Sequence, residues 1–260
     1  MRVYAGVCSH ASPGGAASVG SAALTPRRPM TPPAALASTV PGSAASDRAA
    51  LWLAAAWAAA TATLLAVPAG PVGVRVLAAV AAWHVAVLVG LAVRRDAAWR
   101  TAYGLVAPMS VLLVLPDQFI AVLGTIVFPD TGAPFVGRIP LFMAGMWAIP
   151  LAAVVLAGRA GERRGGPRAG VAAGTLLGLA VFVGAEATSG VLPLWHAVGV
   201  PMAGPLAPYV LPAEAVLCAT TVLADQHVRG RPVAVAVLAG ALVVQAYTGG
   251  LALGWLLLGR

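Results

Sequence analysis

Seven apolar stretches follow one another after residue 48, and Pro/Gly-rich or charged segments separate them. Each stretch has about the 20 residues that an α-helix needs to cross roughly 30 Å of hydrocarbon. Residues 113–138 depart most from the pattern, because Asp117 and Gln118 stand inside an apolar run just after Pro116. The pattern predicts spans at 49–67, 72–93, 101–122, 139–157, 169–191, 207–225 and 232–258.

Two regions depart from a plain series of spans. Residues 1–48 are rich in Ala, Ser, Gly and Pro, which predicts a disordered tail before a transmembrane domain at 49–260. Met30 is an alternative start of translation. In the third span Pro116 favours a kink, after which residues 119–128 either extend the helix or fold back as a re-entrant segment.

Composition excludes a soluble domain. The chain is 60% hydrophobic and only 9% charged, whereas soluble domains are about 25% charged. Cys8 and Cys218 are far apart, so neither a disulfide framework nor a zinc site is indicated. We therefore expect an all-α integral membrane protein, multi-pass in the cell membrane, with the lipid bilayer as its surroundings.

The arginines orient the predicted bundle. All sixteen basic residues are Arg, and most fall in the tail or in the loops at 94–100, 159–168 and 229–231. In a seven-span model these segments share one side, so the positive-inside rule predicts a cytoplasmic N-terminus and an outside C-terminus. The net charge of +8 is thus a topology signal, and we expect no nucleic-acid partner.

Three acids fall inside the predicted spans at a similar depth. Counting 1.5 Å of rise per residue places Asp117, Glu186 and Glu214 in the outer half of the third, fifth and sixth spans. Because a carboxylate facing lipid costs several kcal/mol, the three should point inward toward one another or toward a cavity. We predict them as catalytic residues. Substrate-binding candidates at the same level are Gln118, Asp130, Trp147, Trp195, His196, Tyr209 and Gln245.

These candidates have plainer interpretations as well. Trp195 and Tyr209 suit the aromatic belt at a membrane interface. Asp130, in Asp-Thr-Gly after Pro, suits a turn. Hydrogen bonding between helices would account for the three acids, although acids inside a membrane are functional candidates by default.

A protonated carboxyl group facing an apolar cavity can give its proton to an alkene or epoxide. A second acid and aromatic faces then stabilise the carbocation that forms. No Lys is present for a retinal Schiff base, and DDxxD, DxDD, NDxxD, HExxH and GxSxG motifs are absent. We expect a metal-independent reaction without a cofactor on an apolar isoprenoid.

The spans and isolated acids resemble the small seven-span integral-membrane terpenoid cyclases of meroterpenoid and indole-terpenoid pathways. Residues 117–140, with an acid followed by LGT, DTGAPF and IPLFMAGMWAIP, are also similar to membrane carotenoid hydratases and lycopene-cyclase-like proteins. In the cyclases two membrane acids protonate the substrate and assist, which implies Asp117 as the first acid and Glu214 or Glu186 as the second. Gln245 stands in the seventh span, which holds no acid here.

Three alternatives to a terpenoid cyclase remain. A carotenoid-type hydratase would use the same acids to add water. A proton-coupled small-molecule carrier would use them as a proton relay, although no internal repeat is visible. A non-catalytic assembly factor for a membrane complex would tolerate their replacement by amides.

Overall fold

The computed structural model describes residues 47, 57–58, 61–62, 64–66 and 70–259. The predicted tail lies outside the described residues except for Asp47. The first predicted span is described at only a few positions, and each of these is helical. The described part of the chain is mostly helical, as expected.

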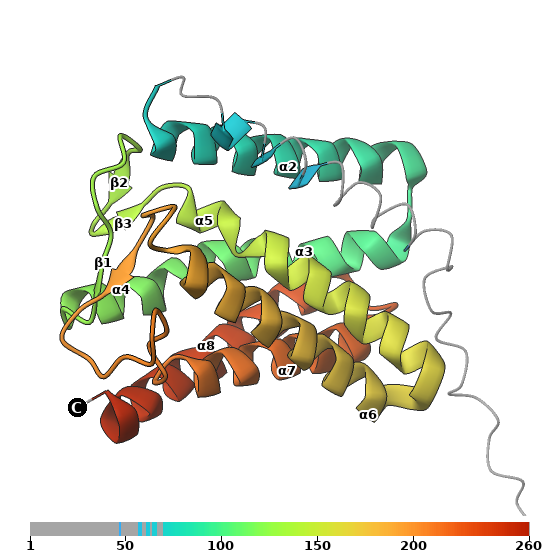
Figure 1. Ribbon diagram of the computed structural model, residues 1–260. Coiled ribbons are helices and arrows are strands. Elements are labelled where there is room, and N and C mark those ends of the chain that lie inside the picture. The colour runs from blue at the N-terminus through green and yellow to red at the C-terminus, as the bar shows by residue number, and fades with distance from the viewer. Residues whose placement is uncertain (1–46, 48–56, 59–60, 63, 67–69, 260) are drawn as a thin grey trace, which may run out of the picture. The chain divides into compact units, whose positions relative to one another are not determined.

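Long helices lie side by side and account for most of the described residues (Figure 1). The largest set of buried apolar side chains joins α3, α6, α7 and α8, and it includes Leu105, Leu151, Leu217 and Leu251. The described helices are α2 (Val72–Arg94), α3 (Ala97–Leu112), α4 (Val114–Val122), α5 (Met143–Met146), α6 (Ala148–Thr188), α7 (Leu211–Val228) and α8 (Val233–Leu258).

Four helical stretches in the described part are long and apolar enough to cross a membrane. They are Val72–Arg94, Ala97–Val122, Met143–Thr188 and Val233–Leu258. Many of their large apolar side chains point away from the protein core, for example Val85, Leu176 and Leu242. A helix bundle that exposes many large apolar side chains is compatible with lipid surroundings.

Helix α6 is a hairpin of two antiparallel arms (Figure 1). The bend lies at Gly165 (φ −144°, ψ 17°) and Gly166 (φ 80°, ψ −175°), directly before Pro167. A positive φ is readily adopted only by glycine, which explains why the chain reverses at this point. The polar loop predicted between the spans 139–157 and 169–191 is therefore a sharp bend between helical arms that extend further than predicted.

Small residues let the second arm of α6 lie close to its neighbours. A Cβ atom added to Gly174 would lie 2.5 Å from Val222 Cγ2 of α7 and 2.9 Å from the Val154 carbonyl oxygen of the first arm. One added to Gly178 would lie 2.2 Å from Cys218 Sγ. Gly170, Gly174 and Gly178 recur at every fourth residue, a spacing that predicts close helix packing, and the structure confirms it.

Gly174→Ala is expected to destabilise the protein by about 1–3 kcal/mol, because the added methyl group overpacks the contact with Val222 and Val154. Gly184→Ala in the same arm is the matched control, since a Cβ atom there has no neighbour within 4 Å. Thermal unfolding followed by circular dichroism in lipid nanodiscs measures both. Equal melting temperatures for the two variants would contradict the close packing.

The third predicted span, 101–122, begins four residues earlier than predicted and is interrupted just before the proline that was expected to kink it. Asp96 caps the start of α3, and its Oδ1 accepts hydrogen bonds from the backbone N–H groups of Ala98 (2.9 Å) and Trp99 (3.1 Å). Leu113 separates α3 from α4, three residues before Pro116. Residues up to Val122 thus continue the span, and the chain then leaves it for a short strand.

Short strands cover the end of the bundle at which α4 finishes. Strand β1 (Ile126–Val127) pairs antiparallel with β4 (His196–Ala197), and β2 (Phe135–Val136) pairs antiparallel with β3 (Ile139–Pro140). The guanidinium group of Arg138 donates to the Ala121 carbonyl oxygen at 2.9 Å and so ties the β2–β3 hairpin to α4. We call this the carboxyl end of the bundle, for the acids described below.

The opposite end carries most of the arginines, and we call it the arginine-rich end. It comprises the α2–α3 turn, the α6 bend and the α7–α8 turn (Figure 1). The described arginines in these segments are Arg94, Arg95, Arg100, Arg159, Arg163, Arg164, Arg168, Arg229 and Arg231. Their gathering at one end agrees with the alternation of arginines that the sequence predicts.

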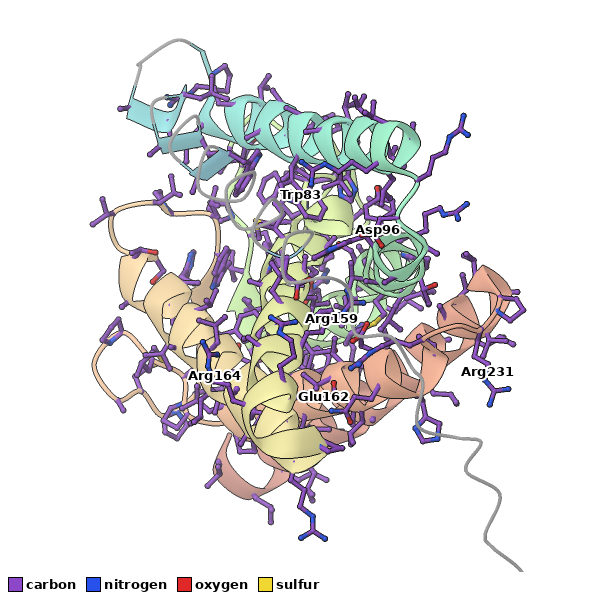
Figure 2. The ribbon with its side chains drawn as sticks, turned by 90° about the vertical axis from the view of Figure 1, so that its right-hand side faces the viewer. Trp83, Asp96, Arg159, Glu162, Arg164 and Arg231 are labelled. Atoms are coloured by element: carbon purple, nitrogen blue, oxygen red, sulfur yellow. The ribbon has the colours of Figure 1, made fainter. Side chains whose placement is uncertain are left out.

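A buried charge network ties α3, α6 and α7 together at the arginine-rich end, and Figure 2 labels two of its members, Arg159 and Glu162. Arg159 is 2% exposed and its partner Asp225 is 1% exposed. The guanidinium group donates through Nη2 to Oδ1 at 2.8 Å and through Nε to Oδ2 at 3.1 Å. It also lies over the ring of Trp99, 5.2 Å from the ring centroid. This bidentate geometry makes Asp225 the main counter-charge of Arg159.

Arg229 extends the network. It donates to Oδ2 of Asp225 at 3.2 Å and forms an ion pair with Glu162 of α6. Burial lowers the pKa of Arg229, but the hydrogen bonds and charges of Glu162 and Asp225 outweigh it and raise that pKa above its ordinary value. Arg229 is therefore charged at any physiological pH, and it depends on both acids for charge balance.

Candidate functional site

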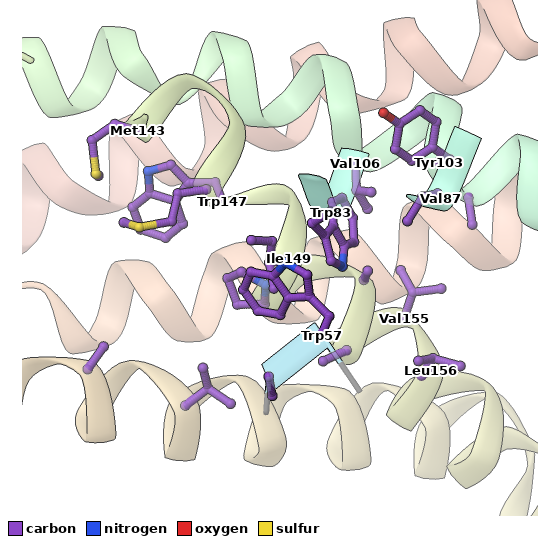
Figure 3. Close-up of a pocket in the computed structure, with 18 of the residues that line it drawn as sticks. Trp57, Trp83, Val87, Tyr103, Val106, Met143, Trp147, Ile149, Val155 and Leu156 are labelled. Carbon is purple, nitrogen blue, oxygen red and sulfur yellow. The ribbon is translucent and has the colours of Figure 1, made fainter. Parts of the chain in front are cut away.

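One cavity of about 1110 Å³ runs between the helices of the bundle. Figure 3 shows Met143 and Trp147 at one end and Leu156 toward the other, with Trp57 and Trp83 between them. Ligand pockets in proteins commonly measure about 300–1,000 Å³, so this cavity is large enough for a long apolar molecule. Its walls are mainly Val, Ile, Leu, Ala and aromatic side chains.

The side chains of Asp117, Glu186 and Glu214 all line this cavity. They come from α4, the end of α6 and the start of α7, at the carboxyl end. Asp117 is 3% exposed and Glu214 is 5% exposed. The helical rise predicts that these acids converge, and the structure confirms that they share one cavity.

Asp117 is held by a tryptophan from the next helix. The indole N–H of Trp147 donates to Oδ2 of Asp117 at 2.9 Å. Within the described part of the chain Oδ1 of Asp117 has no hydrogen-bond partner. One carboxyl oxygen is therefore fixed in position, and the other is left for a ligand.

Glu186 and Glu214 differ in their partners. The indole N–H of Trp195 donates to Oε1 of Glu186 at 2.9 Å. Oε2 of Glu214 is buried and has no hydrogen-bond partner among the described residues. The Glu186 and Glu214 carboxyl groups are close enough to interact electrostatically. A buried polar atom without a partner is costly, so it marks a place where a ligand or water would be expected.

Two aromatic rings pack against Trp147, the residue that holds Asp117. The Trp147 ring lies 5.4 Å from the Phe182 ring and 6.0 Å from the Tyr247 ring, centroid to centroid. Trp147, Phe182 and Tyr247 all line the cavity. The faces of such rings attract a positive charge, so this part of the cavity suits a cationic group or intermediate.

Of the predicted substrate-binding residues, Trp147 and Trp195 line the cavity. The interpretation of Trp195 as an interfacial belt residue is therefore incomplete, because its N–H is used by Glu186. The other five candidates do not line this cavity, so the structure does not bring them to the three acids. They are Gln118, Asp130, His196, Tyr209 and Gln245.

Each of these five has a different position. The Oε1 atom of Gln118 accepts from the backbone N–H of Arg138 at 2.9 Å. Asp130 closes a turn, where its Oδ1 accepts from the N–H of Gly132 at 2.9 Å. His196 is exposed on β4. The side chain of Gln245 is also exposed, on the outside of α8.

Tyr209 is fully buried but lies behind the cavity wall. Its hydroxyl donates to Oγ1 of Thr125 at 3.2 Å, and that hydroxyl donates in turn to the Ile120 carbonyl oxygen. The contact joins the segment before α7 to the end of α4. Tyr209 therefore supports the elements that carry Asp117 and Glu214 without reaching the cavity.

The sequence prediction missed a second aromatic group. Trp57 and Trp83 line the middle of the cavity, and Trp99 and Tyr103 of α3 also line it. With Trp147 and Trp195, five of the seven tryptophans of the chain line one cavity. Their spread over the whole cavity, and not only at the two interfaces, is the signal that distinguishes them from belt aromatics.

His84 lies next to these aromatic residues and is hydrogen-bonded through both ring nitrogens. Its Nε2 lies 3.0 Å from the Gly145 carbonyl oxygen, and its Nδ1 lies 2.7 Å from the Tyr103 hydroxyl. Because a carbonyl oxygen only accepts, Nε2 carries the hydrogen and Tyr103 donates to Nδ1. His84 thus fixes the Tyr103 ring at the cavity wall.

Among the described residues no group of three or more His, Cys, Asp or Glu side chains is arranged to hold a metal ion. A comparison with protein families matches residues 114–258, more than half of the chain, to the family described as "Domain of unknown function (DUF6989)". The chain belongs to that family, and its matched part includes all three cavity acids. No curated protein and no solved structure shows significant similarity to the chain.

Proposed function

We propose that this member of the DUF6989 family is a membrane-embedded terpenoid cyclase that protonates an alkene or epoxide of an isoprenoid without a metal ion. The observation that carries the proposal is the convergence of Asp117, Glu186 and Glu214 on one apolar, tryptophan-lined cavity. Carboxyl groups in water-poor surroundings can act as acids and bases in turn.

The proposed topology has seven spans in the cell membrane. The first is at 49–67, the two arms of α6 are the fourth and fifth, and α7 and α8 are the sixth and seventh. The arginine-rich end faces the cytoplasm, in keeping with the positive-inside rule. The N-terminus is then cytoplasmic, the C-terminus is outside, and the three carboxyl groups lie in the outer half of the bilayer.

Asp117 is the proposed proton donor, from Oδ1. Its proton goes to the terminal alkene carbon, which leaves a carbocation on the neighbouring carbon. The next double bond of the folded chain attacks that cation, a carbon–carbon bond forms, and the charge moves along the chain. The rings of Trp147 and Phe182 and the ionised carboxylates stabilise the cation electrostatically.

Glu214 or Glu186 ends the reaction as a base. It takes a proton from the carbon next to the final cation, and the electron pair of that C–H bond forms a double bond. Proton transfer between the carboxyl groups returns Asp117 to its protonated state, so the product is an isomer of the substrate. A hydratase would instead let water attack the cation, and its product would be heavier by one water molecule.

The test uses purified protein in lipid nanodiscs with linear prenyl alcohols, squalene and their terminal epoxides. Gas chromatography with mass spectrometry detects cyclised or hydrated products. Glu214→Gln should lower turnover, whereas Asp130→Asn, an acid-to-amide change outside the cavity, should not. Absence of any product from the wild type, together with uptake into proteoliposomes driven by a pH gradient, would replace this proposal with the carrier.

A further inference from the structure

The two ends of the cavity differ in exposure. At the carboxyl end Asp117, Met143 and Tyr247 are buried, Glu186 and Trp195 are half-buried, and Val181 is 37% exposed. At the arginine-rich end the lining includes the last turns of α2, where Val89 is 57% exposed and Val93 is 77% exposed. The lining side chains are therefore less exposed beside the carboxyl groups than at the arginine-rich end, where we place the opening of the cavity. We call the open end, lined by Val93, Arg94, Asp96, Trp99 and Leu156, the mouth.

The mouth has a positive charge available for a ligand. Arg94 is the one cationic side chain among the described lining residues, and it is exposed. It has no hydrogen bond or ion pair with the described residues. The neighbouring acid, Asp96, uses its Oδ1 to cap α3. Arg95 and Arg100 are also exposed nearby, so the potential at the mouth favours an anion.

The distance between the mouth and the carboxyl groups sets the length of a ligand that reaches both. Asp96 starts α3 and Asp117 lies 21 residues later on α4, which corresponds to about 30 Å at 1.5 Å per residue. That length is close to the thickness of the hydrocarbon layer, about 30 Å. A ligand in contact with both ends would be a long, extended chain with a polar head.

We propose that the mouth binds the phosphate group of a long-chain prenyl phosphate through Arg94, while the prenyl chain extends along the cavity toward Asp117. A guanidinium group donates parallel hydrogen bonds to phosphate oxygens. The apolar, aromatic walls between the two ends match a polyprenyl chain. This inference rests on the proposed function, since it names the substrate class of that same cavity.

Tryptophan fluorescence measures binding without any turnover, because five of the seven tryptophans line the cavity. The probes are hexaprenyl phosphate, hexaprenol and inorganic phosphate, each titrated against the full chain in phosphatidylcholine nanodiscs. We expect the phosphate ester to bind about tenfold more tightly than the alcohol, as for one charge-assisted contact. Inorganic phosphate alone should leave the fluorescence unchanged.

Arg94→Gln should remove the advantage of the phosphate ester over the alcohol, and Arg94→Lys should keep most of it. Arg231→Gln is the matched control, since Arg231 is exposed at the same end but does not line the cavity. An unchanged ratio of dissociation constants in Arg94→Gln would overturn the proposal. The proposal would also be overturned if adding phosphatidylglycerol to the nanodiscs lowered the affinity for the phosphate ester in an Arg94-dependent way. The mouth would then be a binding site for anionic lipid headgroups.

The same variant separates this inference from the proposed function. Arg94→Gln should raise the KM of the phosphate ester and leave kcat unchanged, because Arg94 lies far from the reacting carbon. If Arg94-dependent binding is found but no product forms with any prenyl compound, the cyclase assignment fails and the headgroup site stands. If products form but binding is independent of Arg94, the headgroup site fails alone.

Discussion

Replacing Asp117 with Asn is expected to lower turnover about 10²- to 10⁴-fold, the usual contribution of a general acid. Asparagine has nearly the same shape, and its side-chain oxygen can still accept the N–H of Trp147. It cannot give a proton to a substrate carbon. The binding of a prenyl ligand, followed by tryptophan fluorescence, should therefore be nearly unchanged while product formation collapses.

Two further variants make the Asp117 result specific. Asp130→Asn, at the turn outside the cavity, should keep wild-type turnover. Trp147→Phe removes the N–H that fixes Oδ2 but leaves Asp117 able to donate, so it should lower turnover less than Asp117→Asn does. If Asp117→Asn retains wild-type turnover in a protein that binds ligand normally, Asp117 is not the proton donor.

Replacing Asp225 with Asn is expected to destabilise the protein by about 3–5 kcal/mol, because Arg159 and Arg229 lose a shared counter-charge in a buried setting. Arg159 cannot turn to solvent easily, since its guanidinium group lies on Trp99 and also donates to the Ala98 carbonyl oxygen. Thermal unfolding in nanodiscs measures the loss, and turnover of the remaining folded protein should be close to normal.

The control for Asp225→Asn is Arg164→Gln. Arg164 is exposed on the same helix as Arg159, and a surface substitution of this kind usually changes stability by less than about 0.5 kcal/mol. The double variant Arg159→Met with Asp225→Leu should be more stable than Asp225→Asn, because it leaves no unpaired charge on Arg159. A melting temperature for Asp225→Asn equal to that of Arg164→Gln would contradict this role of the network.

The level of a residue along the helix bundle could be predicted from the sequence, because the helical rise is constant. That is why the spacing within the spans was enough to place Asp117, Glu186 and Glu214 at one level. The direction of a side chain around its helix could not be predicted in the same way. Tyr247 lines the cavity, whereas Gln245 is exposed, since two residues correspond to about 200° of rotation.

The buried network at the arginine-rich end could not be predicted from the pattern of apolar stretches. A topology rule treats Arg159 as a loop residue, but Arg159 lies within the first arm of α6 and is buried. Its partner Asp225 is 66 residues away in sequence. Such a pair depends on how α6 and α7 pack, and packing between distant segments leaves no local signal. The α6 hairpin closes at Gly165 and Gly166, inside the loop that the sequence predicts, but the exact position of the bend could not be predicted, since glycine permits a bend without requiring one.

The most direct test of proton donation from the cavity is to run the reaction in D₂O with a linear prenyl substrate that ends in an alkene. Carboxyl protons exchange with solvent, so wild-type protein should give a cyclic product with one deuterium on the carbon that was protonated. Glu214→Gln should give less product with the same label, and Asp117→Asn should give almost none. A cyclic product without deuterium would contradict protonation by Asp117, because the ring would then have formed without a proton from the protein.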